Sequence, residues 1–351
     1  MQKVNVLIIT RMELYPGFLD QITAVSPMVS VKNGVKQFAA EQRLNHAKTI
    51  QVNRMERETN VVKGAEENLD SLLAEAEVIL GGFNFPQNMY KRAPNLKWLH
   101  ISTVGLERYS SLDFMRSNIF ITNSRGVISI PIAEHALMFM LMLTKNAQRL
   151  VINKEKKLWD SFTTPELYGK TVGLIGAGSI ATEIARRARG MGMNVIATKR
   201  SVTKNDPVNA DIDKIYPLDQ LKELLHNSDF VVVAAPLTAE TKGMLGIDEF
   251  KAMKKTAFII NIARGPIINE PAMIAALKEG WIAGAGLDVF EKEPLPPDNE
   301  LWVMPNVIIS PHSSGVSERQ PYRLVALFCD NLRRYINKQP LLNVISKDKG
   351  Y

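Results

Sequence analysis

Residues 172–188 read VGLIGAGSIATEIARRA, which is an apolar strand-like run, a glycine turn and an amphipathic helical segment in succession. The turn has the spacing G-x-G-x-x-A, formed by Gly176, Gly178 and Ala181. The first glycine permits a tight turn, the second lets the backbone approach a pyrophosphate, and the small third residue lets the helix pack on the strand. The N–H groups at the start of the helix then face the phosphates. This pattern predicts a dinucleotide-binding turn, with contacts from Gly176, Gly178, Ser179 and Ile180.

Short apolar runs alternate with segments of helical periodicity along the chain. This alternation predicts an α/β protein whose parallel sheets are covered by helices on both faces. Four runs precede residue 125 and six follow it, so we expect two doubly wound parallel-sheet domains in the 351 residues. The expected strands are Val4–Thr10, Val78–Leu80, Leu96–Ile101, Ile119–Thr122, Val172–Ile175, Val195–Thr198, Phe230–Ala234, Ala257–Ile260, Gly284–Asp288 and Val307–Ile309. The expected helices are Gly34–His46, Pro131–Asn146, Ile180–Met191, Leu218–His226, Ile247–Met253, Glu270–Glu279 and Glu318–Asn337.

The end of the strand that follows the glycine turn indicates which dinucleotide binds. NAD-binding folds place an acidic residue there, which holds the ribose 2′-hydroxyl. This chain has Lys199 and Arg200 instead, flanked by the hydroxyls of Thr198 and Ser201. Two cations suit a 2′-phosphate, because charge-assisted hydrogen bonds are stronger than neutral ones. We therefore predict that these four residues bind the cofactor and that NADP(H) is preferred over NAD(H).

Three residues with catalytic chemistry follow the last three expected strands: Arg264, Glu293 and His312. Ligands of open α/β sheets bind at the carboxyl ends of the strands, so these side chains are expected to share one site. A guanidinium can hold a carboxylate and polarise a neighbouring carbonyl group. A histidine can donate a proton near neutral pH, and a carboxylate on its other ring nitrogen fixes the tautomer. We predict that Arg264 orients the substrate, His312 is the acid–base and Glu293 holds His312.

Four stretches carry a resemblance to a known family: GKTVGLIGAGSIATEIARRA, LTAETKGML, FIINIARGPIINEPAMIAALKEGWIAGAGLDVFEKEPLP and NVIISPHSSG. They resemble the D-isomer-specific 2-hydroxyacid dehydrogenases, and the similarity extends from about Leu96 to about Asn337. The resemblance implies a Rossmann coenzyme domain, residues 125–316, inserted into a flavodoxin-like substrate domain, residues 1–124 plus 317–351. It also implies the roles given above for Arg264, Glu293 and His312.

The resemblance implies further contacts. The N–H groups of Val104 and Gly105 would help Arg264 to hold the substrate carboxylate. Asp288 and the carbonyl group near Ala263 would face the nicotinamide carboxamide. Pro236 and Thr241 complete the expected cofactor site. A homodimer through the coenzyme domains is also implied, with the helix that begins at Pro131 at the interface.

The activity implied is hydride transfer from NADPH to the C2 carbonyl of a 2-oxo acid, which gives a D-2-hydroxy acid. Glyoxylate and hydroxypyruvate are the expected substrates, and larger 2-oxo acids stay as alternatives. Formate dehydrogenases of this type have glutamine in place of Glu293, and phosphite dehydrogenases use a lysine in the loop that here reads Ser102–Gly105 and contains none. Neither of these two activities is therefore expected. After the histidine that corresponds to His312, many members have an apolar residue and then glycine or alanine, whereas this chain has Ser313-Ser314. The stretch GGFNFP, with Phe83, Asn84 and Phe85, either lines the substrate pocket or packs at the hinge.

A second class of function uses the same fold, because function depends on the site and not on the fold. Some transcriptional corepressors with this fold sense dinucleotides and bind partner peptides. We expect the enzyme instead, because no long polar tail follows the last expected helix.

Composition narrows the partners that we expect. The only cysteine, Cys329, excludes an internal disulfide and any multi-cysteine metal site. The net charge of +7 is scattered, and no nucleic-acid-binding motif accompanies it. The N-terminus does not resemble a signal peptide, and no apolar run is long enough to span a bilayer. We expect a cytoplasmic protein that binds a small acid and a dinucleotide, without a metal, nucleic acid or membrane.

Overall fold

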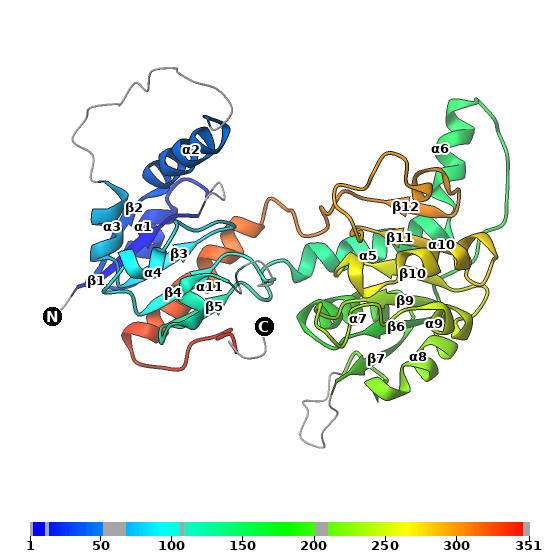
Figure 1. The fold of residues 1–351 in the computed structure, drawn as a ribbon. Coiled ribbons are helices and arrows are strands. Elements are labelled where there is room, and N and C mark those ends of the chain that lie inside the picture. Colours follow the sequence, from blue (N-terminus) through cyan, green and yellow to red (C-terminus); the bar gives the residue numbers. More distant parts are fainter. Residues whose placement is uncertain are drawn as a thin grey trace. The chain divides into compact units, whose positions relative to one another are not determined.

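The chain divides into two compact units in the computed structural model (Figure 1). The split unit consists of Met1–Val127 and Glu318–Tyr351, and the inserted unit consists of Ile128–Ser317. The structure describes residues 3–10, 14–51, 68–105, 109, 111–200 and 210–346, and for residues 44–51 it describes the backbone alone. Within these residues, no helix has both the length and the apolar character needed to cross a membrane.

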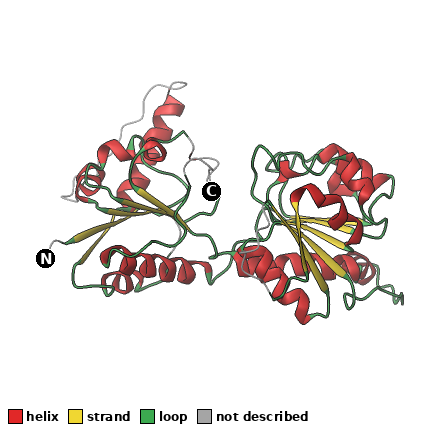
Figure 2. Ribbon diagram, turned by 90° about the horizontal axis from the view of Figure 1, so that it is seen from below, coloured by secondary structure: helices red, strands yellow, loops and turns green. Residues whose placement is uncertain are grey.

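The split unit is built on a five-stranded parallel sheet with the order β2-β1-β3-β4-β5, the order of flavodoxin-like folds. Its strands are β1 Val4–Ile8, β2 Val29–Asn33, β3 Val78–Gly81, β4 Trp98–Ile101 and β5 Phe120–Asn123. Its α-helices are α1 Phe18–Thr23, α2 Val35–Gln51, α3 Leu69–Glu75, α4 Met89–Arg92 and α11 Gln320–Ile336. A short 3₁₀ helix, Asp113–Arg116, precedes β5. Helices cover both faces of the sheet (Figure 2).

Aromatic packing attaches the C-terminal helix α11 to the sheet formed by the N-terminal part of the chain. Trp98 of β4 stacks on Phe328 and Tyr335 of α11, with ring centroids 5.2 and 5.6 Å apart. The Tyr335 hydroxyl donates a hydrogen bond of 2.7 Å to Glu77 Oε1. Large buried aromatic rings contribute much of the stability of a core. The two separate stretches of sequence therefore form one folded unit.

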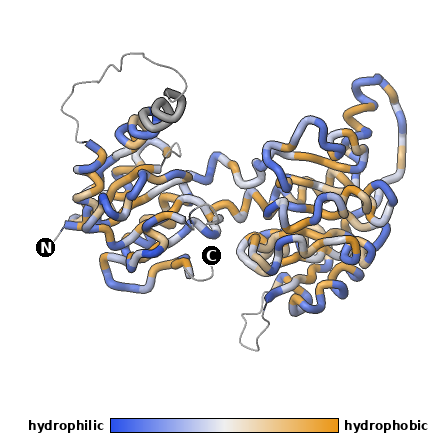
Figure 3. Tube along the Cα trace, viewed as in Figure 1, coloured by the Kyte–Doolittle hydropathy of each residue, from blue (hydrophilic) through white to orange (hydrophobic). Residues whose placement is uncertain are grey.

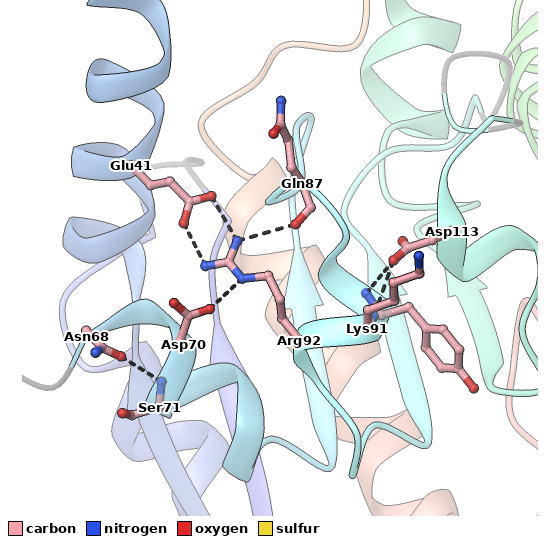
Figure 4. A network of polar contacts seen from close by, with 9 residues as sticks. Glu41, Asn68, Asp70, Ser71, Gln87, Lys91, Arg92 and Asp113 are labelled. Carbon is pink, nitrogen blue, oxygen red and sulfur yellow. Dashed lines mark hydrogen bonds and ion pairs between the residues drawn. The ribbon is translucent and has the colours of Figure 1, made fainter. Parts of the chain in front are cut away.

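An arginine joins helices α2, α3 and α4 of this unit (Figure 4). The guanidinium of Arg92 donates to both carboxylate oxygens of Glu41, at 3.0 and 2.7 Å, and to Asp70 Oδ1 at 2.6 Å. Asn68 caps α3 by accepting a hydrogen bond from the Ser71 N–H group. The helix expected at Gly34–His46 is thus present as α2, and its contacts fix it to the outer layer of the unit.

The buried histidine of β4 makes the stability of the split unit depend on pH. Burial lowers the pKa of His100 from 6.5 to about 3. Its Nδ1 lies 2.8 Å from Thr122 Oγ1 and its Nε2 lies 3.1 Å from Ser124 Oγ, so the neutral ring is hydrogen-bonded on both nitrogens. Below pH 6.5 the unfolded chain binds a proton that the folded unit excludes. Stability should therefore fall by about 1.4 kcal/mol per pH unit between pH 6.5 and 3.

Urea unfolding at pH 7, 6, 5 and 4 measures this effect, with His100→Gln as the comparison. The variant lacks the titrating group, so its free energy of unfolding should decline less steeply than that of the wild type. Parallel declines of the two proteins would contradict the assignment to His100.

The inserted unit is built on a seven-stranded parallel sheet with the order β12-β11-β10-β9-β6-β7-β8, which is the Rossmann arrangement with one added strand. Its strands are β6 Thr171–Ile175, β7 Asn194–Lys199, β8 Lys214–Pro217, β9 Phe230–Val233, β10 Phe258–Asn261, β11 Gly284–Leu287 and β12 Val307–Ile309. Its α-helices are α5 Ser129–Thr144, α6 Ala147–Glu155, α7 Ser179–Gly190, α8 Leu221–Asn227, α9 Ile247–Ala252 and α10 Glu270–Lys278. Three 3₁₀ helices, Leu218–Gln220, Gly265–Ile267 and Glu300–Val303, complete the unit.

Two apolar cores cover the two faces of this sheet. One contains side chains of α5 and α7, and the other contains side chains of α8, α9 and α10. The strands β6, β9, β10 and β11 consist largely of apolar residues and glycine, and orange segments run through the middle of this unit in Figure 3. Strands buried on both faces are expected to be apolar throughout. The predicted fold class, two doubly wound parallel sheets, is confirmed.

Candidate active site

The glycine turn lies where the order of the large sheet reverses, between β6 and β9. Gly176 has φ 108°, a backbone conformation that favours glycine, and a Cβ atom there would lie 3.0 Å from the Ala234 carbonyl oxygen. A Cβ atom on Gly178, which precedes α7, would meet no protein atom within 4 Å. The turn is therefore packed against β9 at its first glycine and open at its second. This arrangement fits a pyrophosphate lying on the N-terminus of α7.

Neighbouring hydroxyl groups support the turn. The Gly176 N–H group donates to Thr198 Oγ1 at 3.3 Å, and the Thr198 side chain is buried. Ser129 of α5 donates to Ser179 Oγ at 3.0 Å. Ile180 packs partly buried against the core on the α7 face. Within the protein, Thr198 thus fixes the glycine turn, and its contact with a cofactor stays a prediction.

The end of β7 presents two cations. Lys199 is the last residue of the strand and is half-buried, whereas Arg200 is exposed. Arg200 Nη2 lies 2.8 Å from Glu240 Oε2. Exposed ion pairs of this kind contribute only about 0–1 kcal/mol, so a phosphate can replace Glu240 at little cost. Ser201 lies outside the described residues.

The loop after β9 is held by one threonine. Thr241 Oγ1 donates to the Pro236 carbonyl oxygen at 2.7 Å and accepts from the Thr238 N–H group at 2.8 Å. These bonds fix the loop at the carboxyl end of the sheet, on the side of the glycine turn. Both residues predicted for the cofactor site, Pro236 and Thr241, therefore belong to one ordered turn.

Arg264 follows the end of β10 in a loop shaped by an asparagine. Asn261 donates from Nδ2 to the Arg264 carbonyl oxygen and accepts the Ala263 N–H group on Oδ1, both at 3.1 Å. Arg264 Nη1 donates to the Ala263 carbonyl oxygen at 2.7 Å. The next residue, Gly265, packs so closely on the following strand's loop that a Cβ atom would lie 1.9 Å from the Phe290 carbonyl. This close packing joins the arginine loop to the loop that carries Glu293.

The predicted glutamate–histidine pair is formed. His312 Nδ1 lies 2.7 Å from Glu293 Oε2. The other carboxylate oxygen, Oε1, accepts the Phe290 N–H group at 3.1 Å, so both oxygens of Glu293 are fixed. Because a carboxylate only accepts hydrogen bonds, the proton lies on Nδ1 of His312. The opposite nitrogen, Nε2, is the one that the predicted proton transfer would use, and that transfer stays a prediction.

The backbone of His312 is left-handed, with φ 51°. This conformation costs a non-glycine residue roughly 1–2 kcal/mol. The His312 N–H group donates to the Asp288 carbonyl oxygen at 2.9 Å. A non-glycine residue held in such a conformation is typical of functional sites.

Asp288 lies fully buried beneath this loop. Its Oδ1 accepts Ser310 Oγ at 2.5 Å and the Ser313 N–H group at 2.9 Å, and its Oδ2 accepts the Ser314 N–H group at 3.0 Å. Burial raises the pKa of Asp288, but the hydrogen bonds from the hydroxyl groups of Ser310 and Ser314 and from the two amides outweigh burial and hold the pKa below its ordinary value. The carboxylate is therefore ionised, and its predicted contact with the nicotinamide stays a prediction.

The residues predicted from the split unit lie at the carboxyl end of β4. Asn123 donates from Nδ2 to the Val104 carbonyl oxygen at 3.1 Å, and Thr103 Oγ1 donates to the Gly105 carbonyl oxygen at 3.4 Å. These two hydrogen bonds fix the backbone of the loop through the carbonyl groups of Val104 and Gly105. The substrate contacts of Val104 and Gly105 stay predictions.

The structure distinguishes the two aromatic residues of GGFNFP. Phe85 packs edge-on against Tyr109 and Phe114, with centroids 5.4 and 4.9 Å apart, and it fills the space beside Gly81. Phe83 is 60% exposed. Phe85 therefore belongs to the core of the split unit, whereas Phe83 presents its ring on the surface of that unit.

Two residues of the site have no signal in the sequence. His135 Nε2 lies 2.8 Å from Ser310 Oγ and 4.0 Å from Asp288 Oδ1. Glu240 reaches Arg200 from the loop after β9. His135 lies on α5, 175 residues before Ser310, and periodicity in α5 indicates only an apolar helix. The spacing of residues after a single strand therefore could not predict either contact.

Comparisons with known proteins agree with this geometry. Residues 137–314 match the family model for the NAD binding domain of D-isomer specific 2-hydroxyacid dehydrogenases. The chain is 36% identical over 255 residues to a glyoxylate reductase of Pyrococcus furiosus, an alignment that covers 70% of this chain and 74% of that protein. It is 33% identical over 266 residues to a glyoxylate reductase of Korarchaeum cryptofilum, which covers 74% and 79%.

A solved structure shares the fold. The crystal structure of a D-isomer specific 2-hydroxyacid dehydrogenase from Xanthobacter autotrophicus, in complex with NADPH and MES, matches with a TM-score of 0.77 at 24% identity. The match covers 99% of this chain and 100% of that one. The chain therefore belongs to the D-isomer specific 2-hydroxyacid dehydrogenase family of NAD(P)-dependent oxidoreductases.

Proposed function

We propose that the protein reduces the C2 carbonyl of a small 2-oxo acid with NADPH and forms a D-2-hydroxy acid. The observation that carries this proposal is the hydrogen bond between His312 and Glu293, which lies beside the Arg264 loop at neighbouring strand ends. Relatives up to 36% identical are glyoxylate reductases, which supports glyoxylate or hydroxypyruvate as the substrate. The D configuration follows the family.

The residues divide the reaction among them. Arg264 binds the substrate carboxylate and orients the adjacent carbonyl, for which a planar guanidinium is suited. The dinucleotide, when bound, supplies a hydride to C2. As negative charge develops on the carbonyl oxygen, Nε2 of the His312 imidazolium donates a proton to it and forms the hydroxyl group. Glu293 stabilises the imidazolium, and because its carboxylate binds Nδ1, the opposite nitrogen Nε2 points away from Glu293.

The preference for NADPH rests on Lys199 and Arg200. Replacing both residues with glutamine should raise the KM for NADPH by about 10–10²-fold, because each charged hydrogen bond contributes about 1.5–3 kcal/mol and part of it is screened here. The KM for NADH should change little. Steady-state kinetics with both cofactors measures this, with the double exchange Lys222→Gln and Lys255→Gln, at two exposed lysines of the same unit, as a control of equal charge change. An unchanged KM for NADPH would show that the two cations do not bind the 2′-phosphate.

We further propose that the protein is a homodimer through the inserted unit. The helix α5, expected at the interface, buries most of its apolar side chains against α7 and the sheet. A group of exposed apolar side chains lies on α6 and the segment after it, which stand clear of the rest of the unit (Figure 1). They are Leu150, Val151, Ile152, Leu158 and the fully exposed Trp159. Such a patch marks an interaction site, and a second copy of the chain is its proposed partner.

Sedimentation equilibrium tests the dimer. The wild type should have twice the chain mass of 39.2 kDa. The double exchange Leu158→Ser and Trp159→Ser should shift the protein toward the monomer, because it removes apolar area from the patch. Val303→Ser, at another exposed apolar residue, should have no effect. A monomeric wild type, or a double variant that stays fully dimeric, would contradict this interface.

A further inference from the structure

The loop that carries His312 is held at three consecutive backbone amides by one residue. The N–H group of His312 donates to the Asp288 carbonyl oxygen, and the N–H groups of Ser313 and Ser314 donate to the two oxygens of its carboxylate. Successive amides that surround an anion beside a left-handed residue form an anion-binding concavity. The orientation of His312 therefore depends on the position of the Asp288 carboxylate.

That position is fixed from below by a serine and a second histidine. Ser310 Oγ lies 2.5 Å from Asp288 Oδ1 and 2.8 Å from His135 Nε2. The ionised carboxylate only accepts, so the single hydroxyl proton of Ser310 points to Asp288. The Ser310 oxygen then accepts a hydrogen bond from His135, whose Nε2 must carry a proton. Each donor in this series of hydrogen bonds, from His135 through Ser310 to Asp288, thus has one acceptor.

The His135 ring itself is held rigidly. It packs edge-on against Phe139, one turn along α5, with centroids 4.7 Å apart. Its side chain, Ser310 and Asp288 are all largely or fully buried, so water competes little with these hydrogen bonds. Hydrogen bonds in such surroundings are stronger than in water, and their loss leaves a buried polar group without a partner.

We propose that His135 and Ser310 are positioning residues for His312, which act through the Asp288 carboxylate that anchors the His312 loop. This inference rests on the proposed function, because it assumes that His312 transfers the proton. Neither residue touches the substrate. Their effect should appear in kcat, which depends on the geometry of proton transfer, more than in the KM for the 2-oxo acid.

Kinetic measurements on three variants test the proposal. His135→Leu and Ser310→Ala should each lower kcat about tenfold, since a displacement of 1 Å at a reacting group can cost as much as 10²-fold. His135→Gln should retain most activity, because the glutamine Nε2 can still donate to Ser310. Thr144→Val is the control, since it removes another buried hydroxyl bond of α5, that between Thr144 Oγ1 and the Met140 carbonyl oxygen. It should leave kcat unchanged.

Nuclear magnetic resonance of ¹⁵N-labelled histidine gives a readout that does not need turnover. The protein has five histidines, and the ring-nitrogen signals of His312 report its tautomer and its hydrogen bond to Glu293. In His135→Leu and Ser310→Ala these signals should move, whereas in His135→Gln and Thr144→Val they should stay. If the wild type reduced no 2-oxo acid, the proposed function would fail while these signals still tested the positioning.

Wild-type kcat and unchanged His312 signals in folded Ser310→Ala would overturn the inference. Equal losses of kcat in His135→Leu and His135→Gln would also overturn the inference. They would show that the hydrogen-bond donor of glutamine makes no difference, as expected if the ring only filled space. Thermal unfolding of each variant distinguishes a loss of folded protein from a loss of catalytic activity.

Discussion

Replacing His312 with glutamine is expected to lower kcat by about 10²–10⁴-fold, the usual contribution of a general acid–base. Glutamine can hydrogen-bond at the place of Nε2 but cannot donate a proton to a developing alkoxide. The glycine turn and the β7 end lie elsewhere on the sheet, so the affinity for NADPH should be unchanged. Stopped-flow measurement of the hydride-transfer step and fluorescence titration with NADPH measure the two quantities separately.

The matched control is His226→Gln, at an exposed histidine of α8. It should leave both quantities unchanged. Glu293→Gln should fall between the two variants, because the amide still contacts Nδ1 but no longer stabilises the imidazolium. Near-wild-type turnover of His312→Gln would remove His312 from proton transfer.

Replacing Arg264 with glutamine is expected to lower kcat/KM for the 2-oxo acid by about 10²–10³-fold. Removing one partner of a hydrogen-bonded charge pair costs about 2–5 kcal/mol, which covers this range. Arg264→Lys should recover only part of the loss, because an ammonium group restores the charge but not the two parallel hydrogen bonds. Steady-state kinetics on glyoxylate and hydroxypyruvate measure both variants.

Two controls identify the carboxylate as the group that Arg264 binds. Arg186→Gln removes an exposed arginine that pairs with Glu183 on α7, and it should have no effect. An aldehyde without a carboxylate should react poorly with the wild type and lose little more in Arg264→Gln. An equal loss for the aldehyde and the 2-oxo acid would mean that Arg264 supports the loop and not the substrate.

The central strands of both sheets could be predicted from the sequence, but two edge strands could not. Strands such as β9 are buried on both faces and therefore read as unbroken apolar runs. β2 and β8, with the sequences VSVKN and KIYP, lie at sheet edges, and most of their residues are only partly buried or exposed. Their polar residues hide them from a search for apolar runs.

The glutamate–histidine pair could be predicted because parallel strands end at the same edge of a sheet. β10, β11 and β12 are neighbours in the sheet, so the residues that follow them are brought together whatever their separation in sequence. The support beneath the pair could not be predicted in this way. The bond between His135 and Ser310 depends on how α5 packs on the sheet, which no local pattern encodes.

The ion pair between Arg200 and Glu240 gives a second example. The cations at the end of β7 follow directly from the sequence, whereas Glu240, which pairs with Arg200, comes from a loop after another strand. A basic residue at a strand end is thus predictable, but the group that it contacts before a ligand binds depends on tertiary structure.

The most direct test of the account is the loss of NADPH absorbance when the purified protein is mixed with glyoxylate, hydroxypyruvate, pyruvate or phenylpyruvate. The account predicts oxidation of NADPH with at least one of these acids, faster than that of NADH, and a product of the D configuration for every acid except glyoxylate, whose product is achiral. Tight NADPH binding without turnover of any of the four acids would contradict it, and would favour a dinucleotide-sensing regulator on the same fold.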